Sequence, residues 1–192
     1  HELTNHAQYR SWCKHCVVGR ARDDPHHNKP TEDGKQHPII SLDYCTMKHK
    51  TQDKDTDEQK PTTILCMTCS KTQALFTHVV LNKGAASAEI INRCLADINS
   101  LGHNHIIIKA DNEPAIVQLC NALKAARTQS TALENSPKGE SESNGAAENA
   151  VNICKGLVRT IRDKLCDRYK HTIDANHWIM PWIVESIGNT QN

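Results

Sequence analysis

Three carboxylates stand out because of their positions beside apolar segments. Asp43 lies inside an apolar run, Asp111 directly follows the most apolar short run, and Glu148 lies in the first turns of a long helical pattern. An ionised carboxylate in or beside a buried strand is costly unless a cation compensates it. Converging carboxylates supply the hard oxygen ligands that Mg²⁺ and Mn²⁺ prefer. Two such ions, about 3.5–4 Å apart, can clamp the attacking and leaving oxygens of a phosphoryl transfer.

Each carboxylate also has an ordinary structural explanation. Asp43 could be a strand residue that points to solvent, and Asp111 could cap the helix that Pro114 opens. Glu148 could be a solvated acid near the positive end of a helix. The combination favours a metal site, because α/β sheets place their sites beyond the carboxyl ends of adjacent strands.

A second cluster of possible metal ligands lies at the front of the chain. Its pattern is His-x4-His-x6-Cys-x2-Cys, formed by His1, His6, Cys13 and Cys16. Cys-x2-Cys is the usual zinc-knuckle spacing, and two histidines complete a tetrahedral set. Cys13 and Cys16 with His26 or His27 form an alternative set, and a solvated polar segment without zinc is another alternative. A bound zinc ion would stabilise a segment with almost no core of its own.

Composition limits the classes of protein that the chain can represent. Its 192 residues suit one ordinary domain with a small appendage. The 23 Lys and Arg against 22 Asp and Glu exclude a bulk polycation and an acidic disordered tail. No stretch of about 18 apolar residues is present, so we expect no membrane span. The chain starts at His1 rather than Met, which suggests a piece of a longer polyprotein.

The nine cysteines do not form an obvious disulfide framework. Nine is an odd number, and most of the cysteines lie in apolar segments, so we expect a reduced protein. Cys66 and Cys69 repeat the Cys-x2-Cys spacing inside a predicted strand. Positions i and i+3 of a strand face opposite sides, so both are expected to be small core hydrophobes rather than ligands of one metal.

Hydrophobic periodicity predicts an α/β fold with a mixed sheet. The expected strands are 37–47, 62–69, 74–81, 105–110 and 130–133. The expected helices are 87–101 with Ser87 as N-cap, one opening at Pro114, 146–169 and 175–188. Residues 48–60 and 134–145 are expected to be loops. We divide the chain into a zinc-binding-like segment with its linker, 1–36, and a core, 37–192.

The segments around the three acids resemble the catalytic core of retroviral and retrotransposon integrases, the Asp-Asp-Glu group of the RNase H-like superfamily. These segments are SLDYCTM, IKADNEPAI and ENSPKGESESNGAAENAV, and the resemblance covers residues 37–187. The 36 residues between Asp111 and Glu148 are close to the family's spacing. Glu148 opens a helix after a Ser-Asn-Gly turn, as the family's glutamate does. The competing acids are Glu134, Glu140 and Glu142.

This resemblance implies an RNase H-like mixed five-stranded sheet flanked by helices and a polynucleotidyl transferase that cleaves DNA and joins strands. Asp43 and Asp111 would hold two Mg²⁺ or Mn²⁺ ions, and Glu148 would complete the second site. Integrases also carry a His-His-Cys-Cys zinc element before the core. The implied partners are element-end and target DNA in a homo-oligomer, with a nuclear or other intracellular location as part of a retroelement polyprotein. The alternatives are an inactive or domesticated zinc- and DNA-binding remnant, and an RNase H-like nuclease that cuts without joining.

Basic residues cluster on the helix that carries Glu148. Lys155, Arg159 and Arg162 follow Glu148 by 7, 11 and 14 residues, so they share its helical face. A cationic stripe leading away from a metal site suits a phosphate backbone, although an ordinary solvated face is the alternative. Trp178 and Trp182 are expected in the core or at a dimer interface rather than stacked on bases.

Overall fold

The structure is a computed structural model that describes residues 1, 5–20, 37–47, 62–85, 87–135, 145–174 and 177–191. The predicted loop 48–60 and most of the loop 134–145 lie outside the described residues. The same holds for four residues that were alternatives for the zinc and carboxylate sites: His26, His27, Glu140 and Glu142.

Five strands form one mixed sheet in the order β3-β2-β1-β4-β5. They are β1 (Ile39–Met47), β2 (Thr62–Cys69), β3 (Leu75–Val80), β4 (His105–Ala110) and β5 (Ser130–Asn135). β1 pairs antiparallel with β2 and parallel with β4, β2 pairs antiparallel with β3, and β4 pairs parallel with β5. The predicted fold class is therefore confirmed.

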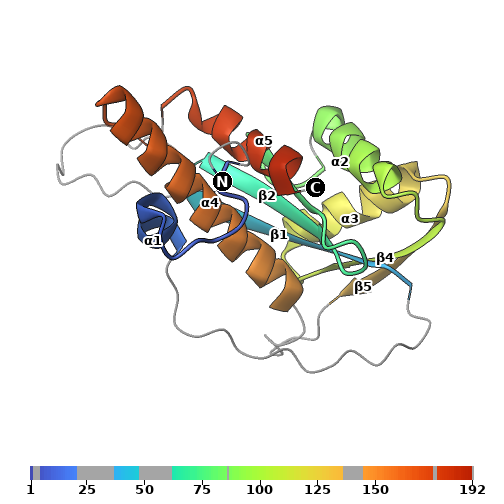
Figure 1. The fold of residues 1–192 in the computed structure, drawn as a ribbon. Helices are drawn as coiled ribbons and strands as arrows, with labels where there is room; N and C mark the ends of the chain where they lie inside the picture. The colour runs from blue at the N-terminus through green and yellow to red at the C-terminus, as the bar shows by residue number, and fades with distance from the viewer. Residues whose placement is uncertain are drawn as a thin grey trace.

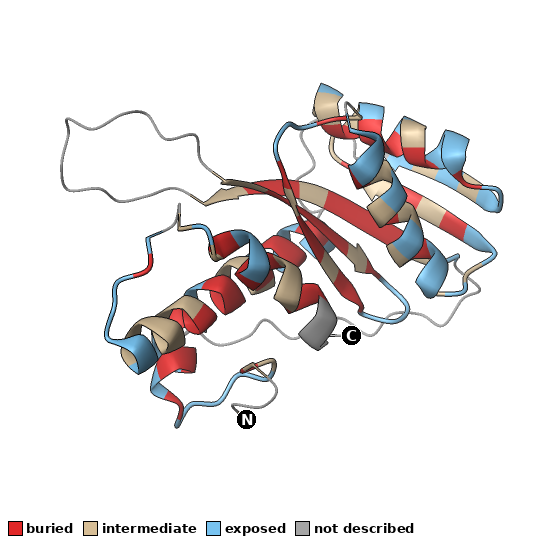
Figure 2. Cartoon of the chain, turned by 90° about the horizontal axis from the view of Figure 1, so that it is seen from above, coloured by how far each residue is buried: buried red, intermediate tan, exposed pale blue. Residues whose placement is uncertain are grey.

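Helices cover both faces of the sheet (Figure 1). They are α1 (Lys14–Arg20), α2 (Ala88–Ser100), α3 (Pro114–Ala126), α4 (Gly145–Tyr169) and α5 (Met180–Gln191). Alternation along β1 sends Leu42 and Tyr44 into the core beneath α2 and α3, and Cys45 into the core beneath α4 and α5. Figure 2 shows that buried residues line the sheet and the inner sides of these helices. Both faces of the central strand are thus covered.

Cys66 and Cys69 test the strand periodicity directly. Each is 1% exposed. Cys66 packs in the core beneath α4 and α5, whereas Cys69 packs in the core beneath α2 and α3. The prediction that they face opposite sides as small core residues is confirmed.

The structure corrects several local predictions. The helix α1 was not predicted, α5 begins at Met180 rather than at residue 175, and β5 continues to Asn135. Ser87 occupies the N-cap position of α2, but its side chain makes no capping hydrogen bond. Trp178 and Trp182 are 74% and 72% exposed, so they do not lie in the core of this chain, and their alternative place at a dimer interface stays a prediction. Within the described ranges, no helix is both long and apolar enough to cross a membrane.

An ionic network around the buried His78 links α2 and α5 to β3. His78 on β3 lies 2.6 Å from Asp97 through Nε2 and 3.4 Å from Glu185 through Nδ1. Glu185 also accepts a hydrogen bond from the Val79 N–H at 3.1 Å and forms an ion pair with Arg93. Burial lowers the pKa of His78, but the hydrogen bonds to the two carboxylates outweigh it, so that the net pKa is raised above 6.5.

The His78→Gln substitution is expected to destabilise the fold in a pH-dependent way. A histidine whose folded pKa is raised contributes stability below its unfolded pKa and loses that contribution as pH rises through the folded pKa. At pH 6 the free energy of unfolding should fall by about 1.5–3 kcal/mol, the range for hydrogen bonds to charged groups. Urea unfolding between pH 6 and 9 measures this loss in the free energy of unfolding. The control is His171→Gln at an exposed position. A wild-type-to-variant difference that does not shrink with rising pH would contradict this account.

Candidate functional site

The sheet places Asp43 and Asp111 at equivalent positions of two neighbouring parallel strands. Ile39 pairs with Ile107 and Ser41 pairs with Lys109. When the same register is continued by two residues, Asp43 comes opposite Asp111. Asp43 lies within β1, and Asp111 is the first residue after β4. Neighbouring strands are about 4.8 Å apart, so this register brings the two half-buried carboxylates into the same neighbourhood.

The electrostatics of Asp43 reflect this proximity. Burial raises its pKa to about 6, and the hydrogen bond that its Oδ1 accepts from the Tyr44 N–H, at 2.7 Å, opposes the rise. Smaller contributions to this rise come from the negative charges of Asp111 and Glu113. Asp43 is therefore not simply a solvated strand residue, because it is partly desolvated and faces other acids.

Asp111 also organises the start of α3. Its Oδ1 accepts a hydrogen bond from the Glu113 N–H at 3.2 Å. Glu113 itself is the N-cap residue of α3, with Pro114 at the first helical position. The alternative role of Asp111 as the helix cap is thus partly right, since its carboxylate braces the turn before the helix while facing Asp43.

Glu148 occupies the first turn of α4 and is exposed. Just beyond it, Ala150, Val151 and Cys154 anchor α4 in the core that includes Cys45 of β1. In the part of the chain that the structure describes, the carboxylate oxygens of Asp43, Asp111 and Glu148 do not form a cluster close enough to hold one metal ion. The strand register and the electrostatics place Asp111 near Asp43, whereas the role of Glu148 as the third acid stays a prediction.

A competing acid has another partner. Glu134 lies on β5, and its Oε1 is 2.7 Å from the Lys109 Nζ on the neighbouring strand β4. Lys109 and Glu134 are directly opposite each other in the pairing of β4 with β5. Glu134 thus already has a cationic partner in the sheet.

Sequence reasoning missed a cation that pairs with Glu113, one of the acids whose charge acts on Asp43. Lys83, in the connection after β3, contacts both carboxylate oxygens of Glu113, at 2.7 and 3.0 Å. Its Nζ also lies 5.2 Å from the centroid of the Tyr44 ring. The Tyr44 hydroxyl accepts a hydrogen bond from the Gly84 N–H at 3.0 Å, and Gly84 adopts φ +97°, which favours glycine. The Lys-Gly turn after a strand was the available sequence signal.

The donor chemistry at Asp43 and Asp111 fits a hard divalent cation. Both donors are carboxylates, and the pKa of Asp43 is raised mainly by burial and, to a smaller extent, by the negative charge of Asp111. A cation between them would relieve the repulsion between the two charges and would keep Asp43 ionised. Two of the three predicted ligands therefore fit Mg²⁺ or Mn²⁺ as they stand.

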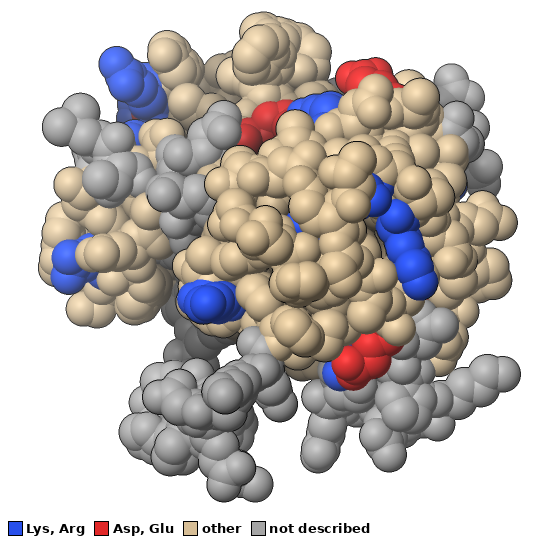
Figure 3. All heavy atoms as spheres, turned by 90° about the vertical axis from the view of Figure 1, so that its right-hand side faces the viewer, with Lys and Arg blue, Asp and Glu red and all other residues tan. Residues whose placement is uncertain are grey.

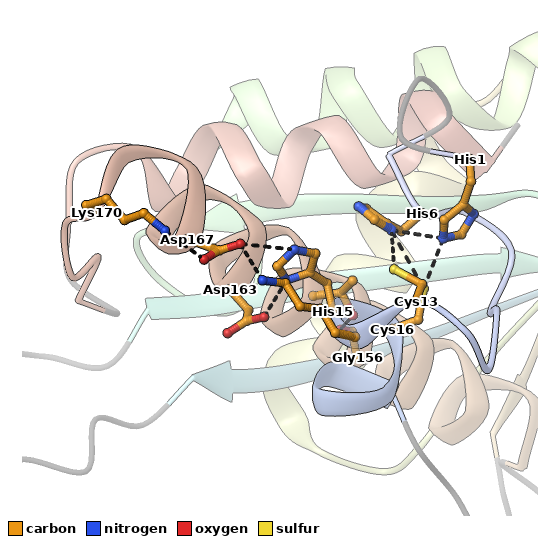
Figure 4. Close-up of polar contacts among 11 residues, drawn as sticks. His1, His6, Cys13, His15, Cys16, Gly156, Asp163, Asp167 and Lys170 are labelled. Atoms are coloured by element: carbon orange, nitrogen blue, oxygen red, sulfur yellow. Dashed lines mark hydrogen bonds and ion pairs between the residues drawn. The ribbon is translucent and has the colours of Figure 1, made fainter.

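The four front ligands converge as the spacing predicted. The ligand atoms of His1, His6, Cys13 and Cys16 all lie within 4.8 Å of one another, so the group could hold a metal ion (Figure 4). The His6 Nδ1 is 3.0 Å from the His1 Nε2 and 3.3 Å from the Cys13 Sγ. The Cys16 Sγ is 3.3 Å from the His1 Nε2. Zn–N and Zn–S bonds of about 2.0–2.3 Å in a tetrahedron give ligand separations of roughly 3.3–3.8 Å, so the set fits zinc.

Local structure explains how the four ligands meet despite the short sequence separation between His6 and Cys13. Cys13 precedes α1 and Cys16 lies in its first turn, and the Val17 N–H donates to the Cys13 carbonyl at 3.0 Å. One helical turn therefore places both thiols on the same side. His6, Cys13 and Cys16 are buried and His1 is half-buried, so most of the cluster lies away from water.

The predicted nucleic-acid stripe lies along α4. Arg159 is exposed, whereas Lys155 and Arg162 are half-buried. On the face shown in Figure 3, the Lys and Arg side chains of the described residues are scattered among uncharged ones. The stripe on α4 remains a prediction.

The Asp111→Asn substitution is expected to lower the pKa of Asp43 from about 6, because one repelling charge is lost. The pKa should stay above 3.8, because burial persists. Carboxyl carbon NMR of the metal-free chain measures this pKa. Glu134→Gln is the matched control and should leave it unchanged, whereas an unchanged value in Asp111→Asn would show that the two aspartates do not interact.

Comparison with solved structures identifies the fold. A chain of the simian T-cell lymphotropic virus intasome in complex with PP2A regulatory subunit B56 gamma superposes with a TM-score of 0.55 at 17% identity, over 87% of this chain. This chain spans 54% of that intasome chain. The trimeric and dimeric forms of the HTLV-2 integrase catalytic core domain in complex with magnesium give TM-scores of 0.48 and 0.49. Both are 17% identical and cover 81% of this chain and 82% and 84% of theirs.

No protein-family model and no curated protein matches the sequence. The likeness to the intasome chain therefore concerns the fold. Together with the sheet order and the front His-His-Cys-Cys cluster, it shows that this chain has an integrase-like fold with a potential zinc site at its N-terminal end.

Proposed function

We propose that this chain is a retroelement integrase that cleaves DNA and transfers strands in a metal-dependent phosphoryl transfer. The observation that carries the proposal is the juxtaposition of Asp43 and Asp111 across parallel strands, in an integrase-like fold. Two mutually repelling, partly buried carboxylates at one edge of a sheet are costly without a cation. Perturbed acids in such a position are typical of functional sites.

Each acid has a distinct role in this proposal. Asp43 and Asp111 hold Mg²⁺ or Mn²⁺, and Glu148 joins from the first turn of α4 to complete a second ion site. The bound ions supply the positive charge that stabilises the attacking and leaving oxygens of the phosphodiester. Because the pKa of metal-free Asp43 is about 6, its proton must leave before the carboxylate can bind a cation. Metal binding should therefore weaken as pH falls below that value.

The remaining parts of the proposal follow the resemblance to integrases. Residues 1–36 form a zinc-binding segment with its linker, and residues 37–192 form the catalytic core. Zinc is held by His1, His6, Cys13 and Cys16. Lys155, Arg159 and Arg162 contact the phosphates of element-end or target DNA. The working form is a homo-oligomer, and the chain derives from a retroelement polyprotein that acts in the nucleus.

The activity is expected to depend on all three acids. Incubation with labelled element-end oligonucleotides and Mn²⁺ should give cleaved and strand-transfer products. Asp43→Asn, Asp111→Asn and Glu148→Gln should each lower the rate roughly 10²-fold or more, the scale for losing a preorganised charge-stabilising group. Glu134→Gln, the acid paired with Lys109, is the control and should stay active.

The same assay separates this proposal from its competitors. Cleavage without joined products would indicate an RNase H-like nuclease. An inert preparation that is folded and zinc-loaded would indicate a domesticated or decayed remnant. Full activity of Glu148→Gln would reject Glu148 as the third acid while leaving the two aspartates in place.

Binding of DNA is expected to involve Arg159, the exposed member of the α4 stripe. Arg159→Gln should weaken binding of unrelated DNA sequences alike and reduce the slope of log K against log salt by about 0.9, the contribution of one phosphate contact. Fluorescence anisotropy over a salt series measures the slope. The matched control is Lys124→Gln, an exposed cation in the last turn of α3. Equal slopes for Arg159→Gln and the wild type would remove Arg159 from the interface.

A further inference from the structure

One side of α4 lies against the zinc-ligand segment rather than against the sheet. Gly156, Thr160, Asp163 and Asp167 recur at spacings of four, three and four residues, so they share one side of the helix. Figure 4 shows this side facing α1 and the four front ligands. We refer to these four α4 residues as the docking stripe.

The backbones of the two helices meet at Gly19. A Cβ atom at this position would lie 2.1 Å from the Thr160 Oγ1 and 2.8 Å from the Thr160 backbone nitrogen. Thr160 cannot move aside freely, because it is fully buried and its hydroxyl donates to the Gly156 carbonyl at 2.9 Å. Any side chain at residue 19 would therefore separate α1 from α4.

Polar contacts extend the docking along the stripe. The His15 Nδ1 is 2.6 Å from Asp163, and the Lys14 Nζ is 2.6 Å from Asp167. His15 is 8% exposed, and its ring meets the His6 ring edge-on, with centroids 5.9 Å apart. A zinc-ligand side chain thus touches the residue that contacts α4. The Lys14 pair is exposed and adds little by itself.

The helix α1 is too weak to hold this position alone. It has seven residues, and isolated helices of that length are unstable in water. Val17 and Val18 are 39% and 70% exposed, so α1 does not bury a continuous apolar side against α4. Cys13, just before α1, and Cys16, in its first turn, belong to the His/Cys cluster, so a bound zinc ion would organise this turn.

We propose that zinc binding by the four front ligands and docking of α1 on the docking stripe are coupled. Zinc orders α1 so that Gly19 and His15 can engage α4, and docking in turn raises the affinity for zinc by the same factor. Since α4 also carries Glu148, zinc loading braces the helix that presents the third proposed acid. This inference depends on the zinc part of the proposed function and not on its DNA chemistry.

Hydrogen exchange of the full chain tests the coupling. Backbone amides of residues 157–167 should exchange on the order of tenfold more slowly in the zinc-loaded chain than in the chelated chain, because a bound ligand stabilises the form that holds it. Zinc content and the absorption of the Co²⁺-substituted chain report binding independently of α4. Gly19→Ala should retain the Co²⁺ spectrum but lose the zinc-dependent protection of α4.

Gly19→Ala is informative because alanine favours a helix more than glycine does. If Gly19 mattered only within α1, the variant would match or exceed the wild type. Val18→Ala, at the exposed neighbouring position, is the matched control and should retain the protection. Asp163→Asn weakens the contact from the α4 side, leaves every zinc ligand in place and should lower the protection even if Gly19→Ala folds poorly.

Two results would overturn the inference. One is a wild-type chain that binds zinc while exchange in α4 stays unchanged. The other is a Gly19→Ala chain that keeps the full zinc-dependent protection. A wild-type chain that binds no zinc would overturn both this inference and the zinc part of the proposed function, whereas the oligonucleotide assay judges the DNA chemistry separately.

Discussion

The parallel pairing of β1 with β4 is the constraint on which the candidate active site depends. Its register carries Asp43 and Asp111 to opposite positions, where one strand continues and the other has just ended. The fold thereby places two carboxylates at a partly desolvated edge, where burial first and the charge of Asp111 second raise the pKa of Asp43. The helices that bury both faces of β1 prevent the strands from shifting to relieve the repulsion between the two carboxylates.

The helix α4 links the candidate catalytic site to the candidate zinc site. Its first turn carries Glu148, its middle packs on the sheet, and its last turns face α1 and the His/Cys cluster. A 25-residue helix spans about 37 Å, so it connects regions that lie far apart in space. Order at one end can therefore influence the position of the other end.

Much of the fold could be predicted because it rests on local periodicity. Alternation identified the strands and placed Cys66 and Cys69 on opposite faces, and the helical repeats identified α2, α3 and α4. The helix α1 could not be found in this way, because it has only seven residues and no apolar repeat, and its contacts are with α4 and the His/Cys cluster. The start of α5 was misplaced for a related reason, since exposed Trp178 lies before the helix and looked like part of a buried pattern.

The candidate site could be predicted only in part from the sequence. Residue types identified the two aspartates and the four front ligands, and the structure brings each set together. The pairing of Lys83 with Glu113 joins residues thirty positions apart through a turn, and no local pattern predicts such a contact. Glu148 follows residues 136–144, which lie outside the described residues. Its role as the third acid is therefore a proposal.

Crystals of the chain grown or soaked with Mn²⁺ would test the central claim most directly, through anomalous scattering from the metal. The account predicts a Mn²⁺ peak held by the carboxylates of Asp43 and Asp111, with Glu148 as the third protein ligand, and predicts that the peak disappears in Asp111→Asn. A crystal with Mn²⁺ at other sites and none at these two aspartates would contradict the account.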